Sequence, residues 1–459
     1  MAATPIPLTL RGPKGSRLTN TELDTNFGNL SRAVQAVETA TPPLFKRNYW
    51  KKLATVLDNM SAATTNWTLF SGTVTLANSA SNVLTQLGHS NSLKIDVGTS
   101  FARIQRTIPA TVLTGTVDIW VYISSDPPAT ASVNVMYSKD GFVTYMETPF
   151  TTAQYLRSGW NRLSVNVAED GSTWSNGVAP AATGSTSFAA AMTGIRLNFG
   201  NFEQASPTTG LPVSLYLGGI FHGGQGQANV LLNWDDAYAS QWDIFNIFRA
   251  RELTGSLSVI PSAVGGGGLT LAQLRTIYDW GWDVVNHTLH GTAGNIASDS
   301  DSVVRTKIGG CRDWMLTNGF SRTANVLVWP ENAYNDRVTA IAREYGITIA
   351  RGNKNRITRT HSGIDNPARL GSTDLGGKTL AQAKKLLDAA ELYSGTQIIS
   401  GHSMSGSAAS PAAGGTPPAN GLDWYYNDYI ALADDIAARV TAGTLSCINY
   451  SQLMANCRI

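Results

Sequence analysis

The sequence predicts a multidomain protein with three parts: a short N-terminal helical neck, a jelly-roll-like β-sandwich and a C-terminal β/α barrel. Several domains are expected because 459 residues exceed what one hydrophobic core usually organises. The middle of the chain contains short strand-like segments, whereas strand-like and helical segments alternate in the last half. We place the neck at residues 1–44, the sandwich at 45–222 and the barrel at 228–459.

The composition excludes some classes of partner. Only 14% of the residues are charged, against roughly 25% in soluble domains, and the formal net charge is +2. This balance gives no electrostatic basis for binding nucleic acid or an anionic membrane. No apolar stretch approaches the length of a membrane span, so we expect no membrane insertion. A surface of small neutral residues suits an extracellular or virion protein that handles neutral or sugar-like ligands.

The N-terminal segment combines an extended start with one predicted helix. Prolines and glycines keep residues 5–15 extended, and Thr19 with Glu22 forms a capping-box pattern at a helix start. Apolar residues then recur at spacings of four and three, as in a heptad repeat: Leu23, Phe27, Leu30, Val34 and Val37. The helix either packs on its own domain or forms an oligomerising neck, and two heptads do not decide between these.

The middle segment alternates in the manner of β-strands. Eight short runs rich in Val, Ile, Tyr and Trp are separated by turn residues within residues 45–222. This pattern predicts a jelly-roll-like β-sandwich, which resembles a carbohydrate-binding module. Trp174 lies in the loop-like run GSTWSNG and is the candidate for stacking on a sugar ring. Alternatively, this part is a spacer that positions the next domain.

The last half of the chain has the order of a β/α barrel. A flexible GGQGQ junction at 223–227 precedes it. The strand-like runs are 229–235, 254–260, 282–287, 325–330, 396–400 and 446–450, and the helical runs are 269–281, 336–346, 380–395 and 429–443. In such a barrel, chemistry takes place at the C-terminal ends of the strands.

The candidate site residues directly follow three of these strands. Asp235 and Asp236 close the run VLLNW, His287 and His290 follow WDVVN, and His402 follows QIISG. In a hydrolytic metal site, one carboxylate and the imidazoles bind a divalent ion while a second carboxylate accepts a proton from water. Alone, an aspartate pair is more often a helix cap and a single histidine more often structural. Their order within one β/α pattern favours the metal site.

These motifs resemble those of the polysaccharide deacetylase superfamily, carbohydrate esterase family four, which has a distorted β/α barrel. NWDDAY stands at the first motif, NHTLH at the second, VWPENAYND at the third and GHS at the fifth. The resemblance implies that Asp235 is the general base and His402 the general acid. It also implies that Asp236, His287 and His290 bind a divalent metal, most simply zinc. Such a catalytic domain would remove acetyl groups from sugars.

The same resemblance implies a set of substrate contacts. Four of them come from the third motif, one flanks the aspartates, and one stands for the basic residue of the fourth motif. The predicted contacts are Trp329, Glu331, Asn332, Tyr334, Trp234 and Arg369.

The chain departs from the family pattern in three places. The two histidines are three residues apart, whereas the family places them four apart, and His361 is an alternative ligand. Ala237 replaces the glycine of the first motif. The third motif has no arginine, so we expect the family's contact between arginine and the base to be missing or replaced.

The run GSRLTNTELDTNFGNL at 15–30 resembles the N-terminal part of bacteriophage tail fibre and tailspike proteins. That resemblance implies a virion location with action at the host cell surface. It also implies a homotrimer attached to phage tail or baseplate proteins through the N-terminus.

Together these patterns predict a phage tailspike that deacetylates a bacterial surface polysaccharide, capsule or O-antigen, used as its receptor. Whether the acetyl group is bound to nitrogen or oxygen stays open. One alternative is a non-catalytic adhesin, which the short histidine spacing favours. Another is a glycoside hydrolase that uses paired carboxylates, Asp235 with Glu331.

Overall fold

The computed structural model describes residues 50–52, 55–85, 89–152, 156–168, 180–226, 228–290, 295–352, 367–406 and 411–457. Residues Met1–Tyr49 form a unit separate from Trp50–Ile459, which is one compact unit. The predicted neck helix, Trp174 and His361 lie outside the described residues. The proposed boundaries at 44, 222 and 228 stay predictions. No described helix combines the length and the apolar character needed to cross a bilayer.

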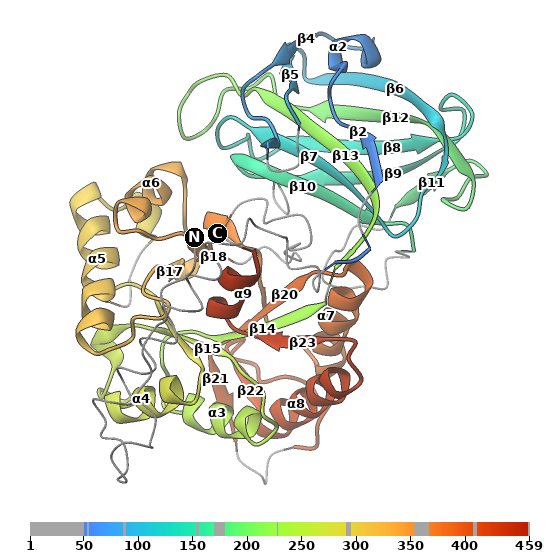
Figure 1. Ribbon diagram of the computed structural model, residues 1–459. Coiled ribbons are helices and arrows are strands. Elements are labelled where there is room, and N and C mark those ends of the chain that lie inside the picture. The colour runs from blue at the N-terminus through green and yellow to red at the C-terminus, as the bar shows by residue number, and fades with distance from the viewer. Residues whose placement is uncertain are drawn as a thin grey trace, which may run out of the picture. The chain divides into compact units, whose positions relative to one another are not determined.

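Residues 50–226 form two antiparallel sheets (Figure 1). The first has the order β10-β7-β13-β5-β4, with β1 and β2 also paired to β13, and the second has the order β11-β9-β8-β12-β6-β3. The first sheet contains β1 (Trp50–Lys52), β2 (Thr55–Asp58), β4 (Val74–Ser79), β5 (Ser92–Val97), β7 (Thr116–Ile123), β10 (Gly159–Asn166) and β13 (Leu215–Gly226). The second contains β3 (Thr68–Ser71), β6 (Phe101–Val112), β8 (Ser132–Ser138), β9 (Tyr145–Thr151), β11 (Ala181–Thr183) and β12 (Ala191–Gly200); the short helix α2 spans Ala63–Asn66.

Alternating apolar side chains from both sheets fill one core. Val133 and Val135 of β8 belong to the same buried cluster as Ile119 and Val121 of β7. The two-residue spacing brings these side chains to one face of each strand, which is how facing sheets exclude water. The eight predicted runs overlap strands of these sheets, whereas β9 was not predicted because Glu147 and Pro149 interrupt its apolar pattern.

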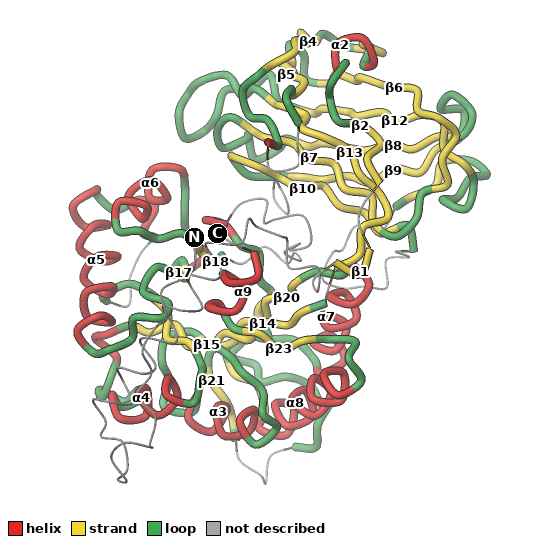
Figure 2. The backbone as a smooth tube through the Cα atoms, in the orientation of Figure 1, coloured by secondary structure: helices red, strands yellow, loops and turns green. Residues whose placement is uncertain are grey.

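The second half of the unit contains a curled sheet (Figure 2). All of its ladders are parallel. Its order is β18-β17-β16-β15-β14-β20-β19, and β23 also pairs with β14. The strands are β14 (Asn229–Trp234), β15 (Ser256–Val259), β16 (Asp283–Asn286), β17 (Val326–Val328), β18 (Ile349–Arg351), β19 (Thr373–Asp374), β20 (Thr396–Gly401) and β23 (Ser446–Ile448). A separate pair is formed by β21 (Ser403–Ser405) and β22 (Asp423–Tyr425).

The central strand β14 explains why the barrel is distorted. One of its edges pairs with β20 along its whole length. Its other edge is divided, since Asn229–Leu231 pair with β23 and Asn233–Trp234 pair with β15. The curled parallel sheet confirms the predicted β/α architecture in this coarse form.

Six of the described helices pack against one face of the curled sheet, and a seventh, after the last strand, packs against the other face. They are α3 (Gln241–Arg249), α4 (Leu271–Asp279), α5 (Asp301–Thr317), α6 (Asp336–Glu344), α7 (Leu380–Tyr393), α8 (Tyr426–Thr441) and α9 (Tyr450–Cys457). Four of them, α4, α6, α7 and α8, match predicted helical segments. The sequence pattern did not predict α5, whose adjacent Gly309 and Gly310 lower its helix propensity. Both glycines allow close packing: a Cβ on Gly309 would lie 2.4 Å from the Tyr345 ring, and one on Gly310 would lie 2.7 Å from Leu289.

Candidate active site

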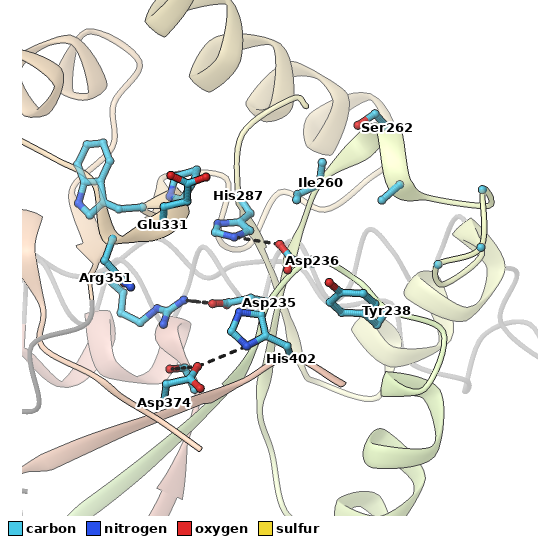
Figure 3. A pocket seen from close by; sticks show the side chains of 18 residues that line it. Asp235, Asp236, Tyr238, Ile260, Ser262, His287, Glu331, Arg351, Asp374 and His402 are labelled. Atoms are coloured by element: carbon cyan, nitrogen blue, oxygen red, sulfur yellow. Dashed lines mark hydrogen bonds and ion pairs between the residues drawn. The ribbon is translucent and has the colours of Figure 1, made fainter. Parts of the chain in front are cut away.

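The ends of seven parallel strands surround one pocket of about 900 Å³ (Figure 3). Each strand contributes at least one residue at or just after its C-terminal end. These are Asp235 and Asp236 after β14, Ile260 after β15, His287 after β16, Trp329 after β17, Arg351 in β18, Asp374 in β19 and His402 after β20. The parallel topology therefore brings together groups that lie up to 167 residues apart in the chain, as from Asp235 to His402.

Asp235 is buried, and one of its two carboxylate oxygens accepts three hydrogen bonds. Oδ1 accepts hydrogen bonds from Asn233 Nδ2 at 2.6 Å, Ser258 Oγ at 2.5 Å and Arg351 Nη2 at 2.7 Å. Oδ2 accepts a bond from Arg351 Nη2 alone among the described residues, at 2.5 Å. Oδ2 therefore keeps a lone pair for a further donor in the pocket.

Arg351 determines the charge of Asp235. Burial raises the pKa of this carboxyl, but the Arg351 guanidinium lowers it, with smaller contributions from His287, His402 and the Ser258 hydrogen bond, and the pKa becomes about 2. Arg351 is itself buried and also donates to Ser372 Oγ at 3.2 Å. The arginine contact to the first aspartate is therefore present in this chain, although it comes from β18 and not from the third motif.

Asp236 and His287 point toward each other in the pocket (Figure 3). The distance from His287 Nε2 to Asp236 Oδ1 is 3.3 Å, and His287 Nδ1 lies 2.9 Å from the Val328 carbonyl oxygen. A proton on Nδ1 satisfies that carbonyl and leaves the Nε2 lone pair directed at the space beside Asp236. Burial lowers the pKa of His287, whereas the hydrogen bond and charge of Asp236 and the charge of Asp235 raise it, and the net change is upward.

This pair fits part of a divalent-metal site. An imidazole whose second nitrogen is bound to a carbonyl, together with a carboxylate, is a common zinc donor set. A catalytic zinc usually has three protein ligands, and the described residues contain no group of three His, Cys, Asp or Glu side chains placed to hold one ion. Among the described residues, Asp236 and His287 are thus placed to supply two donors to a divalent ion.

His290 is not brought to this pocket. Its side chain is exposed and lines a separate depression with Ser302, Val303, Thr306 and Lys307. Thr288 has a left-handed backbone, φ 71°, and the Thr288 hydroxyl donates to the His290 carbonyl oxygen at 3.2 Å. This turn directs His287 inward and His290 outward, so the expectation that His290 completes the metal triad is corrected.

His402 lies on the opposite side of Asp235, beside a second carboxylate. The distance from His402 Nδ1 to Asp374 Oδ2 is 3.5 Å, and Gly376 N and Ser400 Oγ also donate to Asp374. Burial raises the pKa of Asp374, the charge of His402 lowers it, and the net change is upward. This arrangement orients an imidazole toward the pocket with a carboxylate behind it.

Gln241 connects the two strand ends that carry Asp235 and His402. It is fully buried, and its Nε2 donates to the Asp235 carbonyl oxygen at 2.5 Å and to the His402 carbonyl oxygen at 2.7 Å. The Asp235 amide also donates to the Gly401 carbonyl oxygen at 2.9 Å. These bonds fix the separation of the two site residues through the backbone.

Strained backbone is concentrated around the pocket. Eleven non-glycine residues among those described have positive φ, and five of them follow the strand ends of the site: Asp236, Ala237, Thr288, Glu331 and Asn332. Such conformations cost on the order of 1–3 kcal/mol each and persist where the surrounding structure requires them. The side-chain directions of the site are therefore held by the fold.

The outer part of the pocket has two walls. One contains Tyr238, Ser262 and the glycines 266–268, and the other contains Trp329, Pro330, Glu331 and Asn332. Tyr238 is 39% exposed, and a Cβ on Gly267 would meet nothing within 4 Å. The walls leave room for a ligand larger than a single acetyl group.

Three of the predicted substrate contacts line the pocket, and three do not. Trp329, Glu331 and Asn332 line it, although Trp329 is itself buried and donates to the Ala368 carbonyl oxygen. Tyr334 packs behind Trp329, with ring centroids 5.8 Å apart.

Trp234 and Arg369 belong to the interior of the protein. Trp234 is 1% exposed and stacks on Trp282 with ring centroids 5.4 Å apart. The Arg369 side chain is 2% exposed and pairs with Asp126 at 2.9 Å and Asp336 at 2.6 Å. The expectation that these two residues contact substrate is corrected, because core packing and ion pairs already occupy them.

Arg351, Asp374, Gln241 and Tyr238 belong to this site but were not predicted from the sequence. Arg351 and Asp374 end parallel strands, so the rule that chemistry lies at C-terminal strand ends would have found them if β18 and β19 had been predicted. No sequence pattern predicts the role of Gln241, because its two hydrogen-bond partners are carbonyl groups far apart in the sequence.

Residues 222–350 match the family model described as polysaccharide deacetylase. The matched segment includes Asp235, Asp236 and His287, whereas Arg351, Asp374 and His402 follow it. The second half of the chain is therefore similar to polysaccharide deacetylases over this segment. No curated protein has a sequence that matches the chain significantly.

Solved structures give only a distant similarity. A family 4 carbohydrate esterase from Streptomyces lividans in complex with acetate is 14% identical, covers 48% of this chain and 90% of its own, and has a TM-score of 0.32. A peptidoglycan deacetylase from Bacillus subtilis is 14% identical, with 50% and 91% coverage and a TM-score of 0.33. A pseudoenzyme of the same esterase family from Bacillus anthracis is 13% identical, with 50% and 66% coverage and a TM-score of 0.34.

Proposed function

We propose that this protein is a metal-dependent carbohydrate deacetylase that removes acetyl groups from a bacterial surface polysaccharide. The observation that carries the proposal is the convergence of Asp235, Asp236, His287, Arg351 and His402 on one pocket in a domain that matches the polysaccharide deacetylase family. The two aspartates are adjacent in sequence but have different environments, as two different tasks require.

Asp235 is the residue that accepts a proton in this mechanism. Its Oδ2 keeps a free lone pair, and its charge is maintained by Arg351 at every pH above about 2. A carboxylate of such low pKa is a weak base, so it deprotonates only a water whose own pKa has been lowered. A divalent ion bound by Asp236 and His287 would supply that acidification and polarise the acetyl carbonyl.

His402 is the proton donor for the leaving group. The attacking water adds to the acetyl carbon, its proton passes to Asp235, and the bond from the acetyl carbon to the sugar nitrogen or oxygen breaks as the His402 imidazolium protonates that atom. Asp374, behind Nδ1, stabilises the protonated imidazole. Acetate and a free amine or hydroxyl result, and the polymer chain length does not change.

The direct test is acetate release from acetylated polysaccharides by the full chain, with and without a chelator. Release that stops with the chelator and returns with added zinc supports the proposal. Shorter oligosaccharides without acetate would instead indicate a glycoside hydrolase, in which Asp235 acts with Glu331.

A non-catalytic glycan-binding adhesin is the second candidate. It is favoured by the outward position of His290, which leaves the described residues with two metal donors. Under this alternative, the metal-loaded protein binds acetylated polysaccharide with no acetate release.

We further propose that the deacetylase domain belongs to a homotrimeric phage tailspike, attached through residues 1–44 to tail or baseplate proteins and acting on its capsule or O-antigen receptor at the host surface. The support is the N-terminal run GSRLTNTELDTNFGNL and the low content of charged residues. Light scattering of the full chain tests the trimer, and binding to host cells before and after enzymatic removal of capsule tests the receptor.

A further inference from the structure

Carboxylates outnumber permanently positive groups around the pocket. Four carboxylates line it, Asp235, Asp236, Glu331 and Asp374, against the single guanidinium of Arg351. The four carboxylates and the one guanidinium give an excess of three negative charges, which a bound divalent ion together with the protonated His402 of the proposed mechanism would balance. No lysine and no second arginine is among the described lining residues.

The one positive group is not accessible to a ligand charge. Arg351 is 2% exposed, and its Nη2 is bound to both carboxylate oxygens of Asp235 while Nη1 donates to Ser372. Arg351 Nε has no hydrogen-bond partner among the described residues but is buried, so the guanidinium balances Asp235 and presents no exposed donor to a carboxylate or phosphate on a sugar.

Glu331 is the negative group that an incoming sugar chain meets. Among the described residues no hydrogen bond or ion pair involves its carboxylate, and its side chain is exposed at the pocket wall (Figure 3). The other wall residues are neutral: Tyr238, Ser262, the glycines and Asn332. The charge selectivity of the two walls thus depends on this single residue, whose backbone is held at φ 51°.

We propose that Glu331 is the specificity-determining residue of this pocket, which selects neutral or amine-bearing acetylated sugar chains and excludes chains that carry carboxylates. This inference rests on the proposed deacetylase function and names its substrate class. A uronate next to the acetylated sugar would approach Glu331 without a compensating cation, whereas an ammonium group would pair with it.

The test uses the full-length, zinc-loaded protein and three probes: N-acetylglucosamine hexamer, partially deacetylated chitosan oligomers, and O-acetylated polygalacturonate. Both acetate release and binding are measured for the natural chain, Glu331→Gln and Glu331→Lys. Asp279→Asn is the matched control, because Asp279 is an exposed acid at the end of α4 that does not line the pocket.

The natural chain should prefer the neutral and amine-bearing probes. Glu331→Gln should lower the ratio of KM or Kd for the polygalacturonate to that for the neutral probe by roughly three- to tenfold, and Glu331→Lys should lower this ratio further. Salt at about 0.5 M should reduce the preference of the natural chain. Asp279→Asn should leave the preference unchanged.

The proposal is overturned if the natural chain prefers the polygalacturonate, or if both Glu331 variants keep the natural ratio of KM or Kd values. Loss of the deacetylase function is a separate result. If no probe releases acetate but binding still follows charge through Glu331, the charge selectivity stands and the catalytic proposal fails.

Discussion

Replacing Arg351 by methionine tests how the site controls Asp235. The substitution keeps an unbranched side chain of similar length and removes the guanidinium that binds both carboxylate oxygens. Asp235 then keeps its burial and its bonds from Ser258 and Asn233 but loses the one opposing charge beside it. The carboxyl should become easier to protonate.

The magnitude follows from the pKa of Asp235. It is about 2 in the folded protein, against the ordinary 3.8, so the ion pair stabilises the fold above about pH 4 and this contribution is lost as the pH falls toward 2. The difference of nearly two pKa units corresponds to about 2.5 kcal/mol. Because burial raises the pKa once Arg351 is removed, the pKa in Arg351→Met should exceed 3.8. The free energy of unfolding at pH 7 should fall by about 3–5 kcal/mol, the usual cost of an unpaired buried charge.

The assay is the pH dependence of kcat/KM between about pH 4 and 8, with urea unfolding of the same proteins. The natural chain should show no acid limb from Asp235 in this range, whereas Arg351→Met should show one that begins above pH 4. Arg351→Lys keeps the charge without the paired bonds and should lie between them. Arg275→Met, on the exposed face of α4, is the matched control for loss of a positive charge.

If kcat/KM of Arg351→Met depends on pH in the same way as kcat/KM of the natural chain, this account of Asp235 is refuted. An unfolding free energy equal to that of the Arg275→Met control would also refute it. Either result would mean that the guanidinium does not set the charge state of the carboxyl.

Three further predictions concern the other groups of the site. His287→Ala should weaken zinc binding at least tenfold in competition with a chromophoric chelator, whereas His290→Ala should leave it unchanged; equal losses would restore His290 to the metal site. Asp374→Asn should lower kcat roughly ten- to a hundredfold with little change in KM, measured as initial rates of acetate release, because the carboxylate behind His402 is lost; a change in KM alone would contradict this positioning role. Gln241→Ala should lower the free energy of unfolding by about 2–4 kcal/mol in urea titrations, because two buried carbonyl groups lose their donor; a loss below about 0.5 kcal/mol would contradict it.

The alternation of strands and helices after residue 228 was sufficient to predict the parallel architecture and most of its central strands. The same pattern predicted that Asp235, Asp236, His287 and His402 would meet, because the ends of parallel strands share one edge of the sheet. What it could not provide was the direction of each side chain after a strand. His290 shows this, since a left-handed Thr288 turns it away from the pocket.

Other parts of the site depend on long-range partners that a local pattern does not contain. Arg351 ends a strand of only three residues, too short for a periodic signal, and its partner Asp235 lies 116 residues earlier. Trp234 was predicted as a substrate contact because it flanks the aspartates, and Arg369 because it stands for the basic residue of the fourth motif. Their burial follows from neighbours supplied by distant segments, namely Trp282 for the first and Asp126 for the second.

The divided edge of β14 has a consequence for the order of folding during synthesis. The first strand of the parallel sheet has partners that emerge from the ribosome much later, β20 at 396–401 and β23 at 446–448. The antiparallel sheets need no residue beyond 226, so they can fold while the second half of the chain is still being translated. Until β23 emerges, one backbone edge of β14 at Asn229–Leu231 has no paired strand. Such an unpaired edge can form hydrogen bonds with a strand of another nascent chain. Slow translation between the codons for β14 and those for β23 would therefore favour aggregation of this protein.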